Sequence, residues 1–199
     1  ILGLSKYPQD SNYYLKFFKK QDAHFGVKIN TPIVKKTLPI NYLKTSGTKG
    51  FRGFLGRKQI RVDLVKNPSY TIFFSHTNLE IYQKLKEHLI QKHTVYTPCL
   101  GSSEYLADLE WVQEVQNASL NQNNHNFIEV HSVIPRKMLV DNQIQFEDKE
   151  YMKITLPNEM IENRIVTEYI EVFYEKNGKT IQCVPKNYFT INNENIVLL

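Results

Sequence analysis

Short stretches in which apolar and polar positions alternate recur along the chain, and this pattern is typical of half-buried β-strands. The clearest is 60–67, IRVDLVKN, where every second residue from Ile60 to Leu64 is apolar. β-branched residues and prolines in 25–43 also favour extended structure over helix. We therefore expect strands over 25–43, 60–67, 70–76 and 94–101 in the first half of the chain.

Two other stretches have the apolar spacing of an amphipathic helix. In 77–92, TNLEIYQKLKEHLIQK, an apolar stripe runs from Leu79 to Leu89, and Glu80 can pair with a lysine one turn later. The stretch 11–22, SNYYLKFFKKQD, predicts a shorter helix with its basic residues near the negative end of the dipole.

These elements follow one another in the order of the βαββαβ ferredoxin-like plan without its first strand. We therefore expect an α+β protein with a ferredoxin-like domain (the fold of RRM and RAMP proteins) over 1–115. The missing first strand leads us to expect that the chain is a fragment of a longer protein.

The second half has a different pattern. A polar stretch at 117–127 is followed by short β-like runs, and residues 111–199 carry 8 basic against 12 acidic residues. In 169–185, YIEVFYEKNGKTIQCVP, two alternating runs meet at Asn177-Gly178, which is the strongest short hairpin signal. We expect an acidic, β-rich C-terminal extension over 116–199.

Four of the eight glycines fall at every third position in 46–61, SGTKGFRGFLGRKQIR, between cations and phenylalanines. Glycine lets a backbone approach a partner closely, cations neutralise phosphates, and aromatic rings stack on unpaired bases. The segment therefore predicts an inserted hairpin over about 44–61 that binds RNA. A solvated surface loop is the alternative, because glycine and charge also produce one.

The charge distribution and the absence of several sequence motifs reduce the number of possible functions. Residues 28–66 hold ten basic residues and one acid, Asp63, within a chain of formal net charge +5. Such single-sign clustering is what phosphate neutralisation requires. The chain has no phosphate-binding loop, no dinucleotide motif and no paired C-x-x-C, and His88 and His93 are an i,i+5 pair that one helical face does not bring together. We expect no metal and no cofactor.

No apolar run is long enough to span a membrane, and the two cysteines lie far apart in the sequence. We therefore expect a cytoplasmic protein without a membrane partner.

The stretch 96–112, YTPCLGSSEYLADLEWV, resembles the strand-and-loop signature of the CRISPR-associated Cas-five family, in the repeat-associated mysterious protein (RAMP) superfamily. Residues 62–76 are similar to the strand pair before the second helix of that family, and the initial ILGL resembles the end of its first helix. The matching residues of the signature are Tyr96, Pro98, Leu100, Gly101, Ser102, Ser103, Asp108 and Trp111.

This resemblance implies a non-catalytic subunit of a prokaryotic type I-B-like Cascade complex, a ribonucleoprotein of antiviral defence. Such subunits cap the foot of the complex, hold the 5′ handle of the crRNA with a thumb-like hairpin, and contact the backbone and large subunits. Target DNA would be met only through the complex, because guide pairing reads its sequence.

On this reading the RNA-binding residues fall into three groups. The phosphate contacts would be Lys49, Arg52, Arg57, Lys58 and Arg61; the wedge beside a kinked nucleotide would be Phe51, Phe54 and Leu55; and Lys35, Lys36 and Lys44 would line the approach. For Phe54 and Leu55, packing against the neighbouring backbone subunit is the alternative.

Two other functions remain open. One branch of the family cleaves repeat RNA without metal, and the nearest candidates here for that chemistry are Tyr42, His76 and the adjacent Lys92 and His93. The other is a protein-interaction module without an RNA role.

Overall fold

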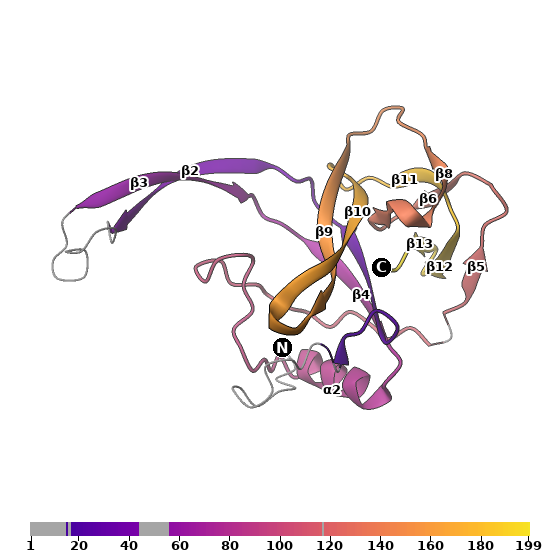
Figure 1. The fold of residues 1–199 in the computed structure, drawn as a ribbon, viewed down its shortest axis with the longest axis horizontal. Coiled ribbons are helices and arrows are strands. Elements are labelled where there is room, and N and C mark those ends of the chain that lie inside the picture. Colours follow the sequence, from indigo (N-terminus) through magenta and orange to yellow (C-terminus); the bar gives the residue numbers. More distant parts are fainter. Residues whose placement is uncertain (1–14, 16, 44–55, 117) are drawn as a thin grey trace.

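The computed structural model describes residues 15, 17–43, 56–116 and 118–199. This part is mostly β, with one α-helix and several small antiparallel sheets (Figure 1). The α+β prediction is confirmed at this coarse level, and the described residues contain no four-stranded ferredoxin-like sheet. The elements are β1 (Ala23–Ile29), β2 (Lys35–Leu43), β3 (Arg57–Val65), β4 (Tyr70–His76), α2 (Leu79–Ile90), β5 (Leu120–Gln122), β6 (Ile128–Val130), β7 (Ile134–Pro135), η1 (Arg136–Met138), β8 (Leu139–Ile144), β9 (Tyr151–Ile161), η2 (Glu162–Arg164), β10 (Ile165–Glu175), β11 (Ile181–Pro185), β12 (Asn187–Ile191) and β13 (Glu194–Ile196).

The predicted second helix is confirmed as α2. It begins after Asn78, whose side-chain oxygen accepts hydrogen bonds from the backbone N–H groups of Glu80 (2.9 Å) and Ile81 (3.3 Å). Beside it, β1 and β4 pair antiparallel over seven residues, and the ring of Phe74 on β4 stacks on Tyr82 of α2. Helix and strand pair are thus joined by aromatic packing.

The first predicted helix is only partly described. Leu15 and Phe17 are helical, residues 11–14 and 16 lie outside the described part, and the chain has left the helix by Phe18. The helix therefore ends earlier than the prediction of residue 22.

The strand predicted over 94–101 is wrong. A single bridge pairs Cys99 with Leu106, and the chain turns back on itself between them. Gly101 has a φ of +95°, and Tyr105 O accepts the N–H of Leu100 at 2.8 Å. This tight turn satisfies backbone groups locally, so the segment that carries the family resemblance is a loop.

The hairpin predicted at Asn177-Gly178 is also wrong, although both of its strands exist. β10 pairs with β7 and β9, whereas β11 pairs with β6 and β8, so the two strands lie in different sheets. The turn between them is a corner that carries the chain from one sheet to the next.

The buried carboxylate of Glu175, at the end of β10, explains why β10 and β11 do not pair with each other. It accepts hydrogen bonds from the backbone N–H groups of Asn177 (2.8 Å), Lys179 (2.7 Å) and Glu150 (3.1 Å). These N–H groups are therefore held by a side chain and are turned away from a ladder between β10 and β11. We call residues 175–179 the corner.

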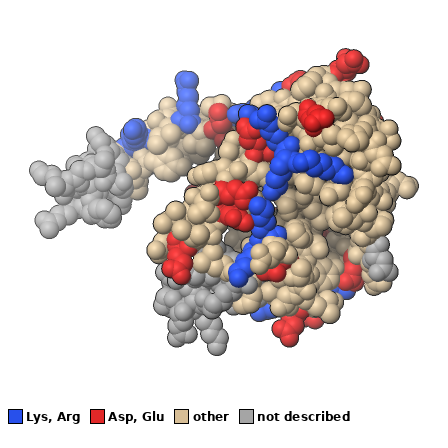
Figure 2. Space-filling model, turned by 45° about the vertical axis from the view of Figure 1, so that its right-hand side comes forward, with Lys and Arg blue, Asp and Glu red and all other residues tan. Residues whose placement is uncertain are grey.

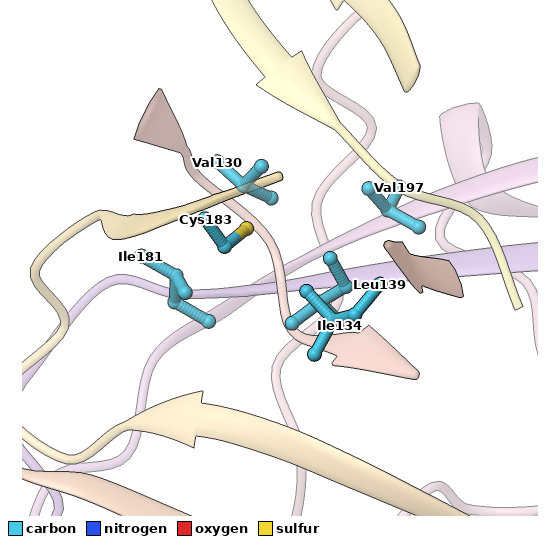
Figure 3. Packing of buried hydrophobic residues seen from close by; sticks show 6 residues of the cluster. All are labelled: Val130, Ile134, Leu139, Ile181, Cys183 and Val197. Carbon is cyan, nitrogen blue, oxygen red and sulfur yellow. The ribbon is translucent and has the colours of Figure 1, made fainter. Parts of the chain in front are cut away.

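The hydrophobic core lies in the C-terminal half (Figure 3). Its side chains come from four short strands and the C-terminal segment, so that no single sheet supplies it. The cluster consists of Val130, Ile134, Leu139, Ile181, Cys183 and Val197.

Backbone hydrogen bonds join β1 to this half. The N–H of Leu199 donates to the carbonyl of Phe25 (2.7 Å), and that of Val133 donates to the carbonyl of Val27 (2.8 Å). Gly26 lies between them, and a Cβ there would come within 3.0 Å of the Leu198 side chain and 3.2 Å of the Val197 carbonyl. Close approach of the C-terminal segment therefore requires glycine at this position of β1.

The described residues include no helix with the length and apolar character needed to cross a membrane.

The two cysteines differ in environment, and this gives a first testable prediction. Burial in the core raises the pKa of the Cys183 thiol to about 12, whereas Cys99 is exposed. Since the thiolate is the reactive form, a disulfide reagent at pH 8 should titrate about one thiol per native chain rapidly. Cys99→Ser should abolish this fast reaction, and rapid titration of two thiols in the native protein would contradict the buried position of Cys183.

Candidate nucleic-acid interface

The most distinctive feature of the structure is a two-stranded arm formed by β2 and β3, which projects from the rest of the molecule (Figure 1). The strands pair without interruption from Lys35, opposite Val65, to Leu43, opposite Arg57. β-branched residues and the alternating pattern of 60–64 explain the extended backbone. The arm continues the β1–β4 pair outward, so the chain runs out along β1 and β2 and returns along β3 and β4.

Paired residues on neighbouring strands share a face of the ribbon, so the register divides the arm into two faces. The polar face carries Lys35, Thr37, Pro39, Asn41 and Leu43 of β2 with Arg57, Gln59, Arg61, Asp63 and Val65 of β3. The apolar face carries Lys36, Leu38, Ile40 and Tyr42 of β2 with Lys58, Ile60, Val62 and Leu64 of β3.

This division separates the predicted RNA-binding cations. Lys35, Arg57 and Arg61 lie together on the polar face, whereas Lys36 and Lys58 lie at opposite ends of the apolar face. The other predicted site residues lie outside the described part of the chain: Lys44, Lys49, Phe51, Arg52, Phe54 and Leu55.

The three cations of the polar face form a spaced row. Arg61 lies four residues along β3 from Arg57, and Lys35 lies opposite Val65, four residues further. At the rise of a β-strand, each step is about 13 Å. All three side chains are exposed, and none forms an ion pair within the described residues.

The arm carries one acid in its described strands, Asp63 on the polar face. Its carboxylate accepts a hydrogen bond from the Thr37 hydroxyl across the ladder at 2.6 Å. Figure 2 shows basic side chains standing out along the arm, whereas both signs mix over the body of the molecule. The polar face is therefore a positive surface that anionic groups can approach from solvent.

The base of the arm is held by the body of the protein. The pairing register changes between the β1–β4 ladder and the β2–β3 ladder, at residues 30–34 and 66–69. There the N–H of Ile33 donates to the carbonyl of Lys176 (2.8 Å), which belongs to the corner. A hydrogen bond from Lys176 to Glu150 in turn lowers the pKa of the Glu150 carboxyl, so both groups are charged at neutral pH. The corner thus fixes where the arm leaves the body.

The residues suggested for metal-independent cleavage do not meet. Tyr42 lies on the arm opposite Lys58, whereas His76 lies at the far end of β4. The Nδ1 atom of His76 accepts the N–H of Asn78 (2.9 Å), so its Nε2 atom donates to the Phe17 carbonyl (2.5 Å). Both ring nitrogens of His76 are therefore engaged in structural hydrogen bonds.

His88 and His93 do meet, although not on one helical face. Their rings stack with centroids 5.0 Å apart and an interplanar angle of 14°. The helix ends in a Schellman motif, in which Lys92 has a φ of +52° and the N–H of His93 donates to the His88 carbonyl. Helical spacing therefore no longer applies to His93, which the chain reversal brings back over the last turn.

The separation of the arm into two faces is what sequence reasoning missed. The signal was available, because Leu38, Ile40 and Tyr42 alternate with polar residues just as Ile60, Val62 and Leu64 do. Without the register, however, the alternation of one strand cannot be aligned with that of the other. A basic stretch counted along the sequence therefore mixed cations from both faces.

No family model, curated protein or solved structure matches the chain. A functional assignment therefore depends on the structural observations given above.

Proposed function

We propose that this chain is a non-catalytic RNA-binding subunit of a CRISPR Cascade-type ribonucleoprotein and that its arm holds the 5′ handle of the crRNA. The observation that carries the proposal is the exposed row of Lys35, Arg61 and Arg57 along one face of the projecting arm. Exposed cations without acidic partners lose little when they bind phosphates, and each releases counterions from the nucleic acid.

The remaining expectations belong to the same proposal. They are a ferredoxin-like domain over 1–115 that includes β1, β4 and α2, an acidic extension over 116–199, a cytoplasmic location, and contacts with backbone and large subunits. Metal-independent cleavage ranks lower, because Tyr42 and His76 lie at opposite ends of the ribbon.

The test compares charge removal on the two faces. We expect Arg57→Gln/Arg61→Gln to weaken binding to a labelled handle RNA at least tenfold at low salt. Loss of two phosphate contacts should also reduce the slope of log affinity against log salt by about 1.4 for a single strand. Fluorescence anisotropy over a salt series measures both.

Lys36→Gln/Lys58→Gln is the matched control, because it removes the same charge from the other face. It should leave the slope nearly unchanged. If both variants lower affinity equally, the effect is one of net charge, and if neither does, the arm does not bind this RNA.

A further inference from the structure

We infer that the apolar face of the arm docks on a partner protein that presents an apolar strip with a carboxylate at each end. The inference deepens the proposed function and rests on it only for the RNA that occupies the opposite face. The arm would then lie between RNA and protein, with each face committed to one of them.

The composition of this face is the first observation. Between Lys36 and Lys58, every described position is apolar: Leu38 pairs with Val62, Ile40 with Ile60, and Tyr42 lies opposite Lys58. Ile60 is 40% exposed and Tyr42 47% exposed, and the other four apolar side chains of the face are half-buried. An apolar ribbon face of this kind is unfavourable in water and marks an interaction surface.

No described element of the body packs extensively over this face. β2 and β3 form a sheet of their own, and among the described elements each has its extensive contacts with the other. The apolar core of the protein is elsewhere, between the short strands of the C-terminal half.

A second copy of the chain is a poor occupant because of the charges. Two apolar faces stacked in antiparallel directions would set Lys36 of one copy against Lys58 of the other, and parallel stacking would set each lysine against itself. Either arrangement buries like charges beside each other, which disfavours the contact.

RNA is a poor occupant of this face as well. Its middle offers neither a cation nor an aromatic ring, because Tyr42 lies at the end beside Lys58, so phosphates there would lose water without gaining a partner. A protein surface with apolar side chains in the middle and carboxylates at the margins complements both features.

The register also fixes a distance for the partner. Lys36 lies six residues along β2 from Tyr42, which is opposite Lys58. The two carboxylates of the partner should therefore be about 20 Å apart, with the apolar strip between them.

Photo-cross-linking in cells that produce the full chain with its partners tests the inference. Benzoylphenylalanine replaces Ile40 on the apolar face or, in a matched control, Asn41 on the polar face. We expect Ile40→benzoylphenylalanine to cross-link a protein, at an apolar strip with acidic ends. Asn41→benzoylphenylalanine should cross-link RNA.

Each other outcome overturns a defined statement. A cross-link from position 40 to RNA or to a second copy contradicts the docking inference. The absence of any cross-link from position 40, when position 41 still cross-links RNA, contradicts it as well. A cross-link from position 40 to an apolar strip with acidic ends on a protein, without RNA at position 41, supports docking and contradicts the RNA proposal. No cross-link from either position contradicts both.

A charge swap on the identified partner makes the test quantitative. Lys36→Glu/Lys58→Glu should weaken binding of the purified partner at least tenfold, and exchanging its two acids for lysines should restore binding to that variant. The RNA-face variant Arg57→Gln/Arg61→Gln should change partner affinity less than twofold. Failure of the swap to restore binding would overturn the assigned carboxylate contacts.

Discussion

Glu175→Ala is expected to lower the free energy of unfolding by about 3 kcal/mol, because three partly buried backbone N–H groups lose their acceptor at once. Glu175 is only 2% exposed, and its carboxylate accepts two backbone N–H groups of the corner and that of Glu150, which precedes β9. A fully buried donor left without a partner costs about 1–3 kcal/mol, and these partly buried donors should each cost about 1 kcal/mol. Urea unfolding followed by far-UV circular dichroism measures the change.

The matched control is Glu171→Ala on the same strand. Glu171 forms ion pairs with Arg136 (2.7 Å) and Lys153 (2.6 Å), which lower the pKa of its carboxyl, but all three side chains are solvent accessible. Exposed ion pairs contribute little to stability, so this variant should unfold close to the wild type. Equal losses in the two variants would show that the corner does not depend on the buried carboxylate.

Gly178→Ala is expected to destabilise the protein by about 3 kcal/mol, from backbone strain and a steric clash together. Gly178 has a φ of +76°, and a Cβ at this position would lie 2.9 Å from the backbone carbonyl oxygen of Ile29. A backbone atom cannot rotate away as a side chain can, so β1 would have to shift near the base of the arm. Thermal and urea unfolding both report the loss.

Gly101→Ala separates strain from clash. Gly101 also has a positive φ, +95°, but a Cβ there meets nothing within 4 Å. It should therefore cost only the strain, about 1–2 kcal/mol. If Gly178→Ala costs no more than Gly101→Ala, contact between the corner and β1 does not limit the substitution.

These two predictions bear on function through the arm. Ile29 ends β1, Ile33 is hydrogen-bonded to Lys176, and β2 begins at Lys35. A shift of the corner would therefore move the root of the arm. Gly178→Ala should therefore lower affinity for the handle RNA as well as stability, although it removes none of the cations of the arm.

Local elements were predictable from the sequence where local forces decide them. The helix α2 has its own cap and apolar stripe, and the strands of the arm have clear alternation, so their type follows from short stretches. The basic character of 28–66 is likewise a property of the composition.

The partners of the strands could not be predicted in the same way. Asn177-Gly178 does turn the chain, but the buried carboxylate of Glu175 binds the turn and sends β11 to a different sheet. A glutamate at the end of an alternating run gives no sign that it will be buried with three donors around it. The prediction of a strand over 94–101 fails for a related reason, since the bridge between Cys99 and Leu106 depends on a local turn.

The sequence by itself determined that the protein has a basic first half, one strong helix and many short strands, because these depend on residue type and local spacing. Only the tertiary structure decided which cations act together. Strand register placed Lys35, Arg57 and Arg61 on one face and turned Lys36 and Lys58 to the other. Register depends on contacts between residues far apart in the sequence, and a shift of one residue reverses every side chain.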